Sequence, residues 1–377
     1  MSPKGQTVTA GGRLTINLGA LVDNWRLLAD RAEGAATAAV VKADAYGIGL
    51  EPAARALAEA GCHTFFVALP EEGFRLRSAV RDAAIYVLDG LLPGMAGYYE
   101  AAKLRPVLGS WPEIEEWIAL RRDGATTPCA VHVDTGMSRL GLTLAEARRL
   151  SGRRDVLSLL SPDLVMSHLA TADTPDHPLN RKQLASFRAV LALLPGIPAS
   201  LANSAGIHLG SDYHFDLVRP GIALYGGAAI EGSTGASRTV VTVEARVLQV
   251  RDVKPGETVG YGASETAGEP RRVAILAAGY ADGYHRLAGS SDRRAGARAF
   301  IRGRHAPLIG RISMDLMAID VTGIAGVERG DWAELIGPNV PVDEVAHHAG
   351  TIGYELLTGL GRRYARTYIG GAEDEAG

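Results

Sequence analysis

Short apolar runs alternate with amphipathic segments from about residue 35 to residue 225. The amphipathic segments, such as residues 51–61 and 181–194, carry apolar residues three and four positions apart, which predicts helices. Several of the runs are almost continuously apolar, as expected for strands of a parallel sheet that are buried on both faces. The eight runs are residues 35–43, 64–69, 84–89, 105–109, 130–134, 163–168, 199–203 and 217–226.

Eight strands that alternate with helices predict a TIM-like (β/α)8 barrel. A doubly wound open sheet is the alternative. The open sheet is less favoured because no glycine-rich dinucleotide fingerprint follows the first run.

The pattern changes near residue 235, after a connector of small residues at 230–237. Further strands follow with little helix between them, which predicts a mainly-β domain. These strands are residues 241–253, 271–278, 305–313, 316–321 and 332–337. We expect a barrel domain over residues 12–235 and a C-terminal β domain over residues 236–377, with the first strand, near residues 13–17, packing with the β domain.

Composition narrows the class of protein. The 39 basic and 42 acidic residues nearly cancel, to a net charge of −3, so nucleic acid is not an expected partner. The first residues lack an apolar run, and no stretch of about 18 apolar residues occurs, so we expect neither a secretory signal nor a membrane span. Cys62 and Cys129 lie far apart in the sequence, which fits buried thiols better than a disulfide framework or a metal site. Together these features predict a cytoplasmic protein without a bound metal.

The first candidate for chemistry is Lys42, at the end of the first apolar run. In a barrel this end of a strand belongs to the active-site face. A lysine among alanines and valines is costly unless it is paired or its pKa falls, and a desolvated lysine suits imine chemistry with an aldehyde cofactor. The alternative is that its ammonium group reaches water from the strand end. Lys4, Lys182 and Lys254 lie in a tail, a helix and a turn and are weaker candidates.

Polar residues also follow the later runs. Phosphate sites in such barrels often lie after strands seven and eight, where the Asn203–Ser204 turn and the backbone N–H groups of Gly221 and Ile222 suit an anion. Each residue alone has an ordinary structural interpretation, such as an ion pair for Arg219 or a buried core histidine for His168.

The ordered combination of motifs resembles the bacterial alanine racemase family over about residues 12–370. The most specific motif is AVVKADAYGIG, which matches the family's pyridoxal-phosphate (PLP) lysine motif. It is followed in the family's order by HVDTGMSRLG, SLANSAG, DLVRPGIALYG, VGYGAS, AGYADGY, GRISMD and GTIGYEL. The resemblance implies a PLP enzyme with a barrel and a β domain. It would interconvert L-alanine and D-alanine, supply D-alanine for peptidoglycan, and form a homodimer with shared active sites.

The resemblance also implies roles for individual residues. Lys42 would hold PLP covalently and act as one base, and Tyr261 of the partner subunit would act as the opposite base. Arg219 would hydrogen-bond the pyridine nitrogen, His168 would bridge Arg219 and Tyr261, and Arg139 would help hold the phenolic oxygen and the substrate carboxylate. The cofactor phosphate would be held by Tyr46, Ser204, Gly221, Ile222 and Tyr354, with Asn203 as a further cofactor contact. The substrate carboxylate would also bind the backbone of Met314 of the partner subunit, and Tyr280 and Asp315 would lie near the entrance.

Two positions depart from the family's pattern. Many members carry a lysine, which becomes carbamylated, two residues before the aspartate of the DTGM segment, and here that position is His132. The negative charge that would orient Arg139 is then absent. A cysteine often precedes the Met-Asp pair, and here that position is Ser313.

Other functions remain open from the sequence. A racemase of serine or lysine would use the same bases on the same scaffold. A PLP-dependent decarboxylase is disfavoured because the glycine-rich phosphate segment of that group is missing. A non-catalytic PLP-binding protein on a single barrel is disfavoured by the predicted β domain with Tyr261.

Overall fold

The computed structural model describes residues 10–233 and 237–371, which divide into two compact units. One unit comprises residues 21–224 and 228–237, and the other comprises residues 1–20, 225–227 and 238–377. Most of the N-terminal segment without an apolar run, including Lys4, and part of the connector at 230–237 lie outside the described residues.

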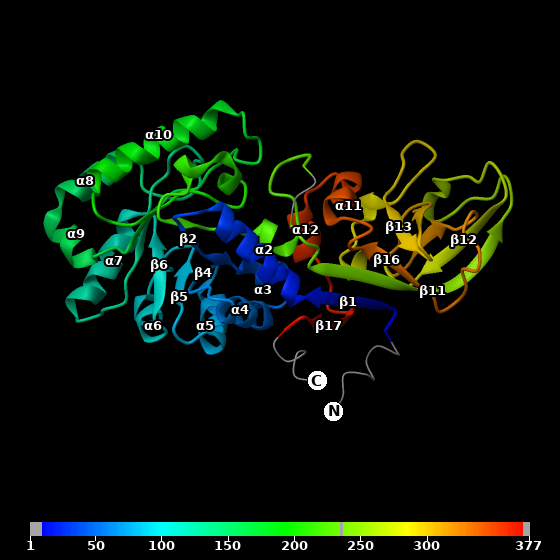
Figure 1. The fold of residues 1–377 in the computed structure, drawn as a ribbon, viewed down its shortest axis with the longest axis horizontal. Coiled ribbons are helices and arrows are strands. Elements are labelled where there is room, and N and C mark those ends of the chain that lie inside the picture. Colours follow the sequence, from blue (N-terminus) through cyan, green and yellow to red (C-terminus); the bar gives the residue numbers. More distant parts are fainter. Residues whose placement is uncertain (1–9, 234–236, 372–377) are drawn as a thin grey trace. The chain divides into compact units, whose positions relative to one another are not determined.

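The first unit is a parallel barrel (Figure 1). Seven strands pair in chain order, and β10 pairs in parallel with β2. The strands are β2 (Ala36–Thr37), β3 (Ala39–Val40), β4 (Thr64–Val67), β5 (Ala84–Val87), β6 (Leu104–Leu108), β7 (Ala130–His132), β8 (Leu164–Met166), β9 (Ala199–Ser200) and β10 (Leu217–Val218).

Backbone hydrogen bonds on both sides of β10 close the ring. On one side, the Arg219 N–H donates to the Ala202 carbonyl at 2.9 Å. On the other side, the Val40 N–H donates to the Pro220 carbonyl at 3.0 Å. Since β2 and β3 are two halves of one strand interrupted at Ala38, the eight-stranded barrel expected from the sequence is confirmed.

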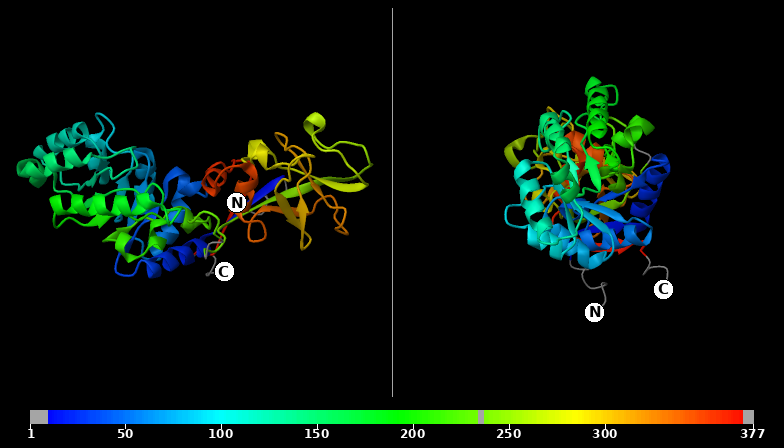
Figure 2. Two further views of the ribbon diagram at one scale, coloured as in Figure 1. Left: turned by 90° about the horizontal axis from the view of Figure 1, so that it is seen from above. Right: turned by 90° about the vertical axis from the view of Figure 1, so that its left-hand side faces the viewer.

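Helices surround the strands of this unit, as the end-on view in Figure 2 shows. In α7, Trp111, Ile114, Trp117 and Ile118 are buried, which is the spacing of one helical face. The helices are α2 (Leu18–Arg31), α3 (Lys42–Tyr46), α4 (Leu50–Glu59), α5 (Pro70–Ala79), α6 (Ala96–Ala101), α7 (Trp111–Arg122), α8 (Leu144–Gly152), α9 (Arg154–Leu160) and α10 (Pro178–Leu193). Short 3-10 turns η2 (Gly206–Leu209), η3 (Ser211–Tyr213) and η4 (Ile222–Tyr225) follow the last two strands.

The second unit is built on a mainly antiparallel sheet whose central strand is β11 (Val241–Val253). The strand β1 (Gly12–Asn17) lies in this sheet, antiparallel to β11 and parallel to β17 (Ala365–Ile369). The other strands are β12 (Arg271–Leu276), β13 (Arg298–Ile301), β14 (Arg304–Pro307), β15 (Met317–Asp320) and β16 (Trp332–Ile336). The unit also contains α11 (Val342–Ala349), α12 (Gly353–Thr358) and the 3-10 turns η5 (Tyr261–Ala263), η6 (Tyr280–Asp282) and η7 (Arg286–Ala288).

The mainly-β character expected for this region is confirmed, but two details differ from the sequence patterns. The run at 305–313 forms a strand only to Pro307, because the chain then crosses to the backbone of Ala318 and Val259. The helices α11 and α12 and the strands β13 and β17 were not expected from the sequence.

Candidate active site

The carboxyl ends of the barrel strands place the candidate residues at one edge of the barrel. Lys42 follows β3, Arg139 lies in the loop after β7, and His168 follows β8. Asn203 and Ser204 follow β9, while Arg219, Gly221 and Ile222 follow β10. The barrel therefore gathers residues that lie up to 180 positions apart in the sequence.

The segment after Lys42 is a turn of left-handed helix rather than an open loop. Ala43, Asp44, Ala45 and Tyr46 have φ angles of 53°, 55°, 52° and 53°. Four consecutive residues with side chains in this region are costly, because the Cβ atom crowds the following carbonyl. Backbone hydrogen bonds maintain the turn, including Ala45 N–H to the Val41 carbonyl at 2.9 Å.

Glu72 of α5 supports this turn from outside. Its carboxylate accepts hydrogen bonds from the Ala43 N–H at 2.6 Å and from the Ala68 N–H, beyond the end of β4, at 2.9 Å. One side chain thus ties the turn beside Lys42 to the neighbouring strand.

The surroundings of Lys42 favour its neutral amine. Burial lowers the pKa of Lys42, and the nearby charge of Arg139 lowers it further, while Asp89 and Glu72 act in the opposite direction. Burial is the largest cause, so the net shift is downward. A lysine with a lowered pKa can act as a nucleophile and as a proton acceptor.

Arg219 is a buried cation held by neutral acceptors. Its guanidinium, 3% exposed, donates to the Ser167 carbonyl at 2.6 Å and to the Ser200 hydroxyl. Among the described residues, it forms no ion pair with a carboxylate. Burial therefore lowers the pKa of Arg219 to about 9, which leaves it charged at neutral pH.

Ser204 and Gly221 form a small polar cup between β9 and β10. The buried Ser204 hydroxyl accepts from the N–H of Gly221 at 2.8 Å and from that of Ala223 at 3.4 Å, so its own proton remains for donation. A Cβ at Gly221 would lie 2.3 Å from the Tyr46 hydroxyl, so only glycine permits this approach. The Asn203 side-chain oxygen accepts from the Gly206 N–H at 2.8 Å and fixes the turn.

Two histidines with lowered pKa values lie near these cations. Burial lowers the pKa of His132 to about 4, with Arg219 and Arg139 as additional causes. Burial and the same two arginines hold the pKa of His168 well below its usual range. Both rings are therefore neutral at pH 7, and His132 supplies no negative charge to Arg139. Arg139 is exposed and, within the described residues, forms no ion pair.

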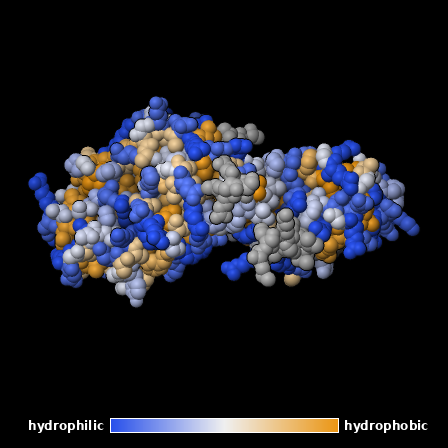
Figure 3. Space-filling model, turned by 60° about the horizontal axis from the view of Figure 1, so that its bottom comes forward, coloured by the Kyte–Doolittle hydropathy of each residue, from blue (hydrophilic) through white to orange (hydrophobic). Residues whose placement is uncertain are grey.

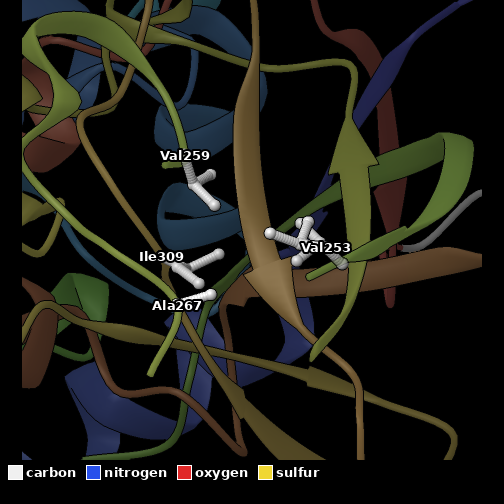
Figure 4. Close-up of a cluster of buried hydrophobic side chains, with 5 residues drawn as sticks. Val253, Val259, Ala267 and Ile309 are labelled. Carbon is white, nitrogen blue, oxygen red and sulfur yellow. The ribbon is translucent and has the colours of Figure 1, made fainter. Parts of the chain in front are cut away.

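In the β unit, Tyr261 lies at the tip of a hairpin. The Ala267 N–H donates to the Glu257 carbonyl at 2.9 Å, and the Val259 N–H donates to the Glu265 carbonyl at 3.0 Å. Val259 and Ala267 anchor the hairpin in a buried cluster with Val253 and Ile309 (Figure 4). The Tyr261 side chain remains 68% exposed.

Backbone contacts bring Tyr280 and Met314 together in the same unit. The N–H groups of Tyr280 and Ala281 donate to the carbonyls of Ser313 and Met314 at 3.0 and 2.9 Å. The Asp315 carboxylate accepts from Arg363 at 2.7 Å. Tyr280 and Met314 are 42% and 54% exposed, and Tyr354, on α12, is 38% exposed.

The sequence analysis missed three residues at the site: Glu72, Ser200 and Gln183, whose amide donates to the His168 carbonyl at 2.9 Å. Glu72 is three residues after Leu69, a capping-box position, and that signal predicts its helix but not its bond to Ala43. Gln183 and Ser200 fall inside periodic runs, where polar residues carry no recognisable signal.

On the face shown in Figure 3, hydrophilic side chains lie among hydrophobic ones. Over the described residues, the helices lack the length and apolar character needed to cross a membrane.

Comparison with known proteins gives consistent matches along the chain. Residues 16–229 match the family model "Alanine racemase, N-terminal domain", and residues 240–368 match "Alanine racemase, C-terminal domain". The chain is 51% identical over 373 residues to an alanine racemase of Rhizobium meliloti (strain 1021), covering 97% of this chain and 98% of that one. It is 49% identical over 365 residues to a biosynthetic alanine racemase of Agrobacterium fabrum, covering 95% and 93%.

A solved structure is also similar. The alanine racemase of Bartonella henselae with covalently bound pyridoxal phosphate superposes with a TM-score of 0.90 at 41% identity. The match covers 96% of this chain and 100% of that chain.

Proposed function

The chain belongs to the alanine racemase family and interconverts L-alanine and D-alanine with PLP as cofactor; we propose that Lys42 and Tyr261 of the partner subunit are its two bases. The observation that carries the role of Lys42 is its place after β3, at the barrel edge where Arg219 and the Ser204–Gly221 cup follow β9 and β10.

The residues at this edge fit PLP. Arg219 is a buried cation without a carboxylate partner among the described residues, which suits an acceptor nitrogen. At Gly221 in the cup, a Cβ would clash with the Tyr46 hydroxyl. The Ser204 hydroxyl of the cup can donate a hydrogen bond to a phosphate. Lys42 has the lowered pKa that attachment to an aldehyde needs.

We assign the holding roles accordingly. Lys42 would hold the cofactor covalently, Arg219 would donate to the ring nitrogen, and Arg139 would serve the phenolic oxygen and the substrate carboxylate. The phosphate would be held by Tyr46, Ser204, Gly221, Ile222 and Tyr354, with Asn203 as a further cofactor contact. Met314 of the partner subunit would help bind the substrate, and Tyr280 and Asp315 would lie near the entrance.

Racemisation removes the α-proton from one face of the substrate and returns a proton on the other, so two bases on opposite faces perform it directly. PLP, when bound, withdraws electrons from the α-carbon and lowers the cost of removing its proton. Lys42 serves one face because its lowered pKa leaves more of the neutral amine at pH 7. Tyr261 serves the other face.

His168 transmits the charge of Arg219. Arg219 Nη2 lies 3.5 Å from His168 Nδ1; because a guanidinium can only donate, a hydrogen bond between them requires Nδ1 as the acceptor and the ring proton on Nε2. A neutral His168 with its proton on Nε2 can donate a hydrogen bond to the side-chain oxygen of Tyr261 of the partner subunit.

We further propose a homodimer with shared active sites. The β unit exposes large apolar side chains that burial against a second copy would remove from water, including Tyr261, Leu287, Met314 and Ile352. The domain division at about residue 235 stays a prediction. A cytoplasmic location also stays a prediction, and the free thiols of Cys62 and Cys129 support it. A role in supplying D-alanine for peptidoglycan stays a prediction, since the chain is similar both to a relative described as biosynthetic, at 49% identity, and to one described as catabolic, at 46%.

The test follows D-alanine formed from L-alanine by a coupled D-amino-acid-specific assay. We expect Lys42→Ala to lose activity together with the visible absorbance of lysine-bound PLP. We expect Tyr261→Phe to keep that absorbance and lose activity. Lys182→Ala and Tyr98→Phe, which change an exposed lysine and an exposed tyrosine elsewhere, are the matched controls. Full activity of Lys42→Ala or of Tyr261→Phe would contradict the assignment of that base.

A further inference from the structure

A buried glutamine bridges the two loops that carry His168 and Arg139. Gln183 lies on α10 and is 0% exposed. Its Nε2 donates to the His168 carbonyl at 2.9 Å and to the Thr135 hydroxyl at 3.2 Å. Its Oε1 accepts from the Ala170 N–H at 2.9 Å. All hydrogen-bonding atoms of this amide are therefore used on the two loops.

The first loop, after β8, depends on this amide. The two bonds to His168 and Ala170 hold the backbone on both sides of Leu169, as a neighbouring strand would hold it. The direction of the His168 ring follows from that backbone. Since the His168 ring lies 3.5 Å from Arg219, a small shift of the loop changes this contact.

The second loop, after β7, is attached at Thr135. The Thr135 and Ser167 hydroxyls lie 2.8 Å apart, so Gln183, Thr135 and Ser167 form one buried polar chain between the loops. The carboxylate of Asp134, the preceding residue, accepts hydrogen bonds from the N–H groups of Gly136, Met137 and Ser138 at 2.9–3.2 Å. Arg139 follows directly, so its position depends on a backbone that Asp134 holds and on the Thr135 side chain that Gln183 holds.

We propose that Gln183 is a positioning residue for the racemisation, which sets the relative placement of His168 and Arg139 without touching cofactor or substrate. The proposal rests on the roles proposed above for these two residues. A displacement of about 1 Å in such a group can lower a rate about a hundredfold, so the expected effect is on kcat rather than on PLP binding.

The neighbouring turn of α10 offers a matched control. Asn180 is an equally buried amide, 1% exposed, and it donates to the carbonyls of Thr171, Thr174 and Pro175. Its loss also removes several buried hydrogen bonds from the same helix, but it releases neither His168 nor Thr135.

The experiment compares Gln183→Leu, Gln183→Glu and Asn180→Leu as holoenzymes. Gln183→Glu keeps the acceptor for Ala170 N–H and removes the donor to the His168 carbonyl, so it tests the same bond if the leucine variant does not fold. The readouts are the melting temperature, the absorbance of bound PLP, kcat and KM in both directions, and the α-deuterium isotope effect starting from each enantiomer.

Both Gln183 variants are expected to keep PLP and to lose about 10- to 100-fold in kcat. The isotope effect should rise mainly for the enantiomer whose proton Tyr261 removes, because His168 supports that base. Asn180→Leu is expected to lower the melting temperature while keeping kcat and both isotope effects.

Two results would overturn the inference: a loss of kcat in the Gln183 variants no larger than in Asn180→Leu, or a loss that follows the disappearance of PLP absorbance. A His168→Ala variant separates this failure from that of the proposed function. If His168→Ala loses activity and the Gln183 variants do not, only the inference about Gln183 is wrong. If His168→Ala is fully active, the role proposed for His168 is wrong, and the inference about Gln183 falls with it.

Discussion

Replacing Ala43 by glycine should stabilise the protein. Ala43 has φ 53° and ψ 51° and its side chain is exposed, so its methyl group contributes strain and little burial. A residue with a side chain in this conformation costs about 1–2 kcal/mol. Glycine removes that cost but loses about 0.5–1 kcal/mol through its greater freedom in the unfolded chain. The net expectation is a gain of about 0.5–1 kcal/mol in the free energy of unfolding.

Two further alanines separate strain from side-chain burial. Ala45 has the same backbone conformation but is fully buried, so Ala45→Gly also loses about 0.8 kcal/mol of apolar burial and should be near neutral. Ala56 lies in the ordinary right-handed helix α4, where Ala56→Gly should cost about 1 kcal/mol.

The assay is urea unfolding at saturating PLP, with the midpoints compared at unchanged slope. Left-handed strain predicts that the free energy of unfolding is highest for Ala43→Gly, intermediate for Ala45→Gly and lowest for Ala56→Gly. If Ala43→Gly lost as much stability as Ala56→Gly, the left-handed strain would be refuted as an energetic feature of this turn.

Two other changes test the packing and the charges of the site. Gly221→Ala places a Cβ 2.3 Å from the Tyr46 hydroxyl, so we expect a loss of about 1–3 kcal/mol in apoprotein stability. Adding Tyr46→Phe should recover part of that loss, and strict additivity in the double-mutant cycle would contradict the clash. His132 has a folded pKa of about 4, below its ordinary value of 6.5, so its contribution to stability is full above pH 6.5 and is lost as the pH falls to about 4. From pH 6.5 down to about pH 4, the free energy of unfolding should fall by about 3 kcal/mol more in the wild-type protein than in His132→Gln. If the free energies of unfolding of the two proteins changed with pH in parallel, His132 would not be buried in its neutral form.

The long elements of the fold were predictable from local patterns. The run at 241–253 coincides with β11, and the periodic segment at 181–194 lies in α10 up to Leu193, because in a long segment the spacing of apolar residues identifies a helix or a strand. The barrel was predicted from the repetition of short runs, even where a strand is only two residues long, as in β9. The sequence did not show that residues 42–46 turn left-handed, since alanine carries no signal for positive φ.

The site residues at strand ends were predictable because a parallel barrel brings its strand ends to one edge. Residues that act through another residue were not. Gln183 lies in a helix at a position that an apolar residue would also fit, and only the fold brings its amide to the loops after β7 and β8. The neutrality of His132 also required the structure, since it depends on burial beside Arg219 and Arg139.

The position of β1 has a consequence for the order in which the chain folds during synthesis. Both sheet partners of β1 come late: β11 begins at residue 241 and β17 at residue 365. At roughly 10 residues per second, a ribosome needs about 20 s after β1 to produce β11, and the whole barrel emerges in that interval. The barrel can therefore close while β1 still has two unpaired edges. The β unit completes only when nearly the entire chain is made, so the unit that carries Tyr261 is the last to form, and nascent chains should acquire protease resistance in the barrel first.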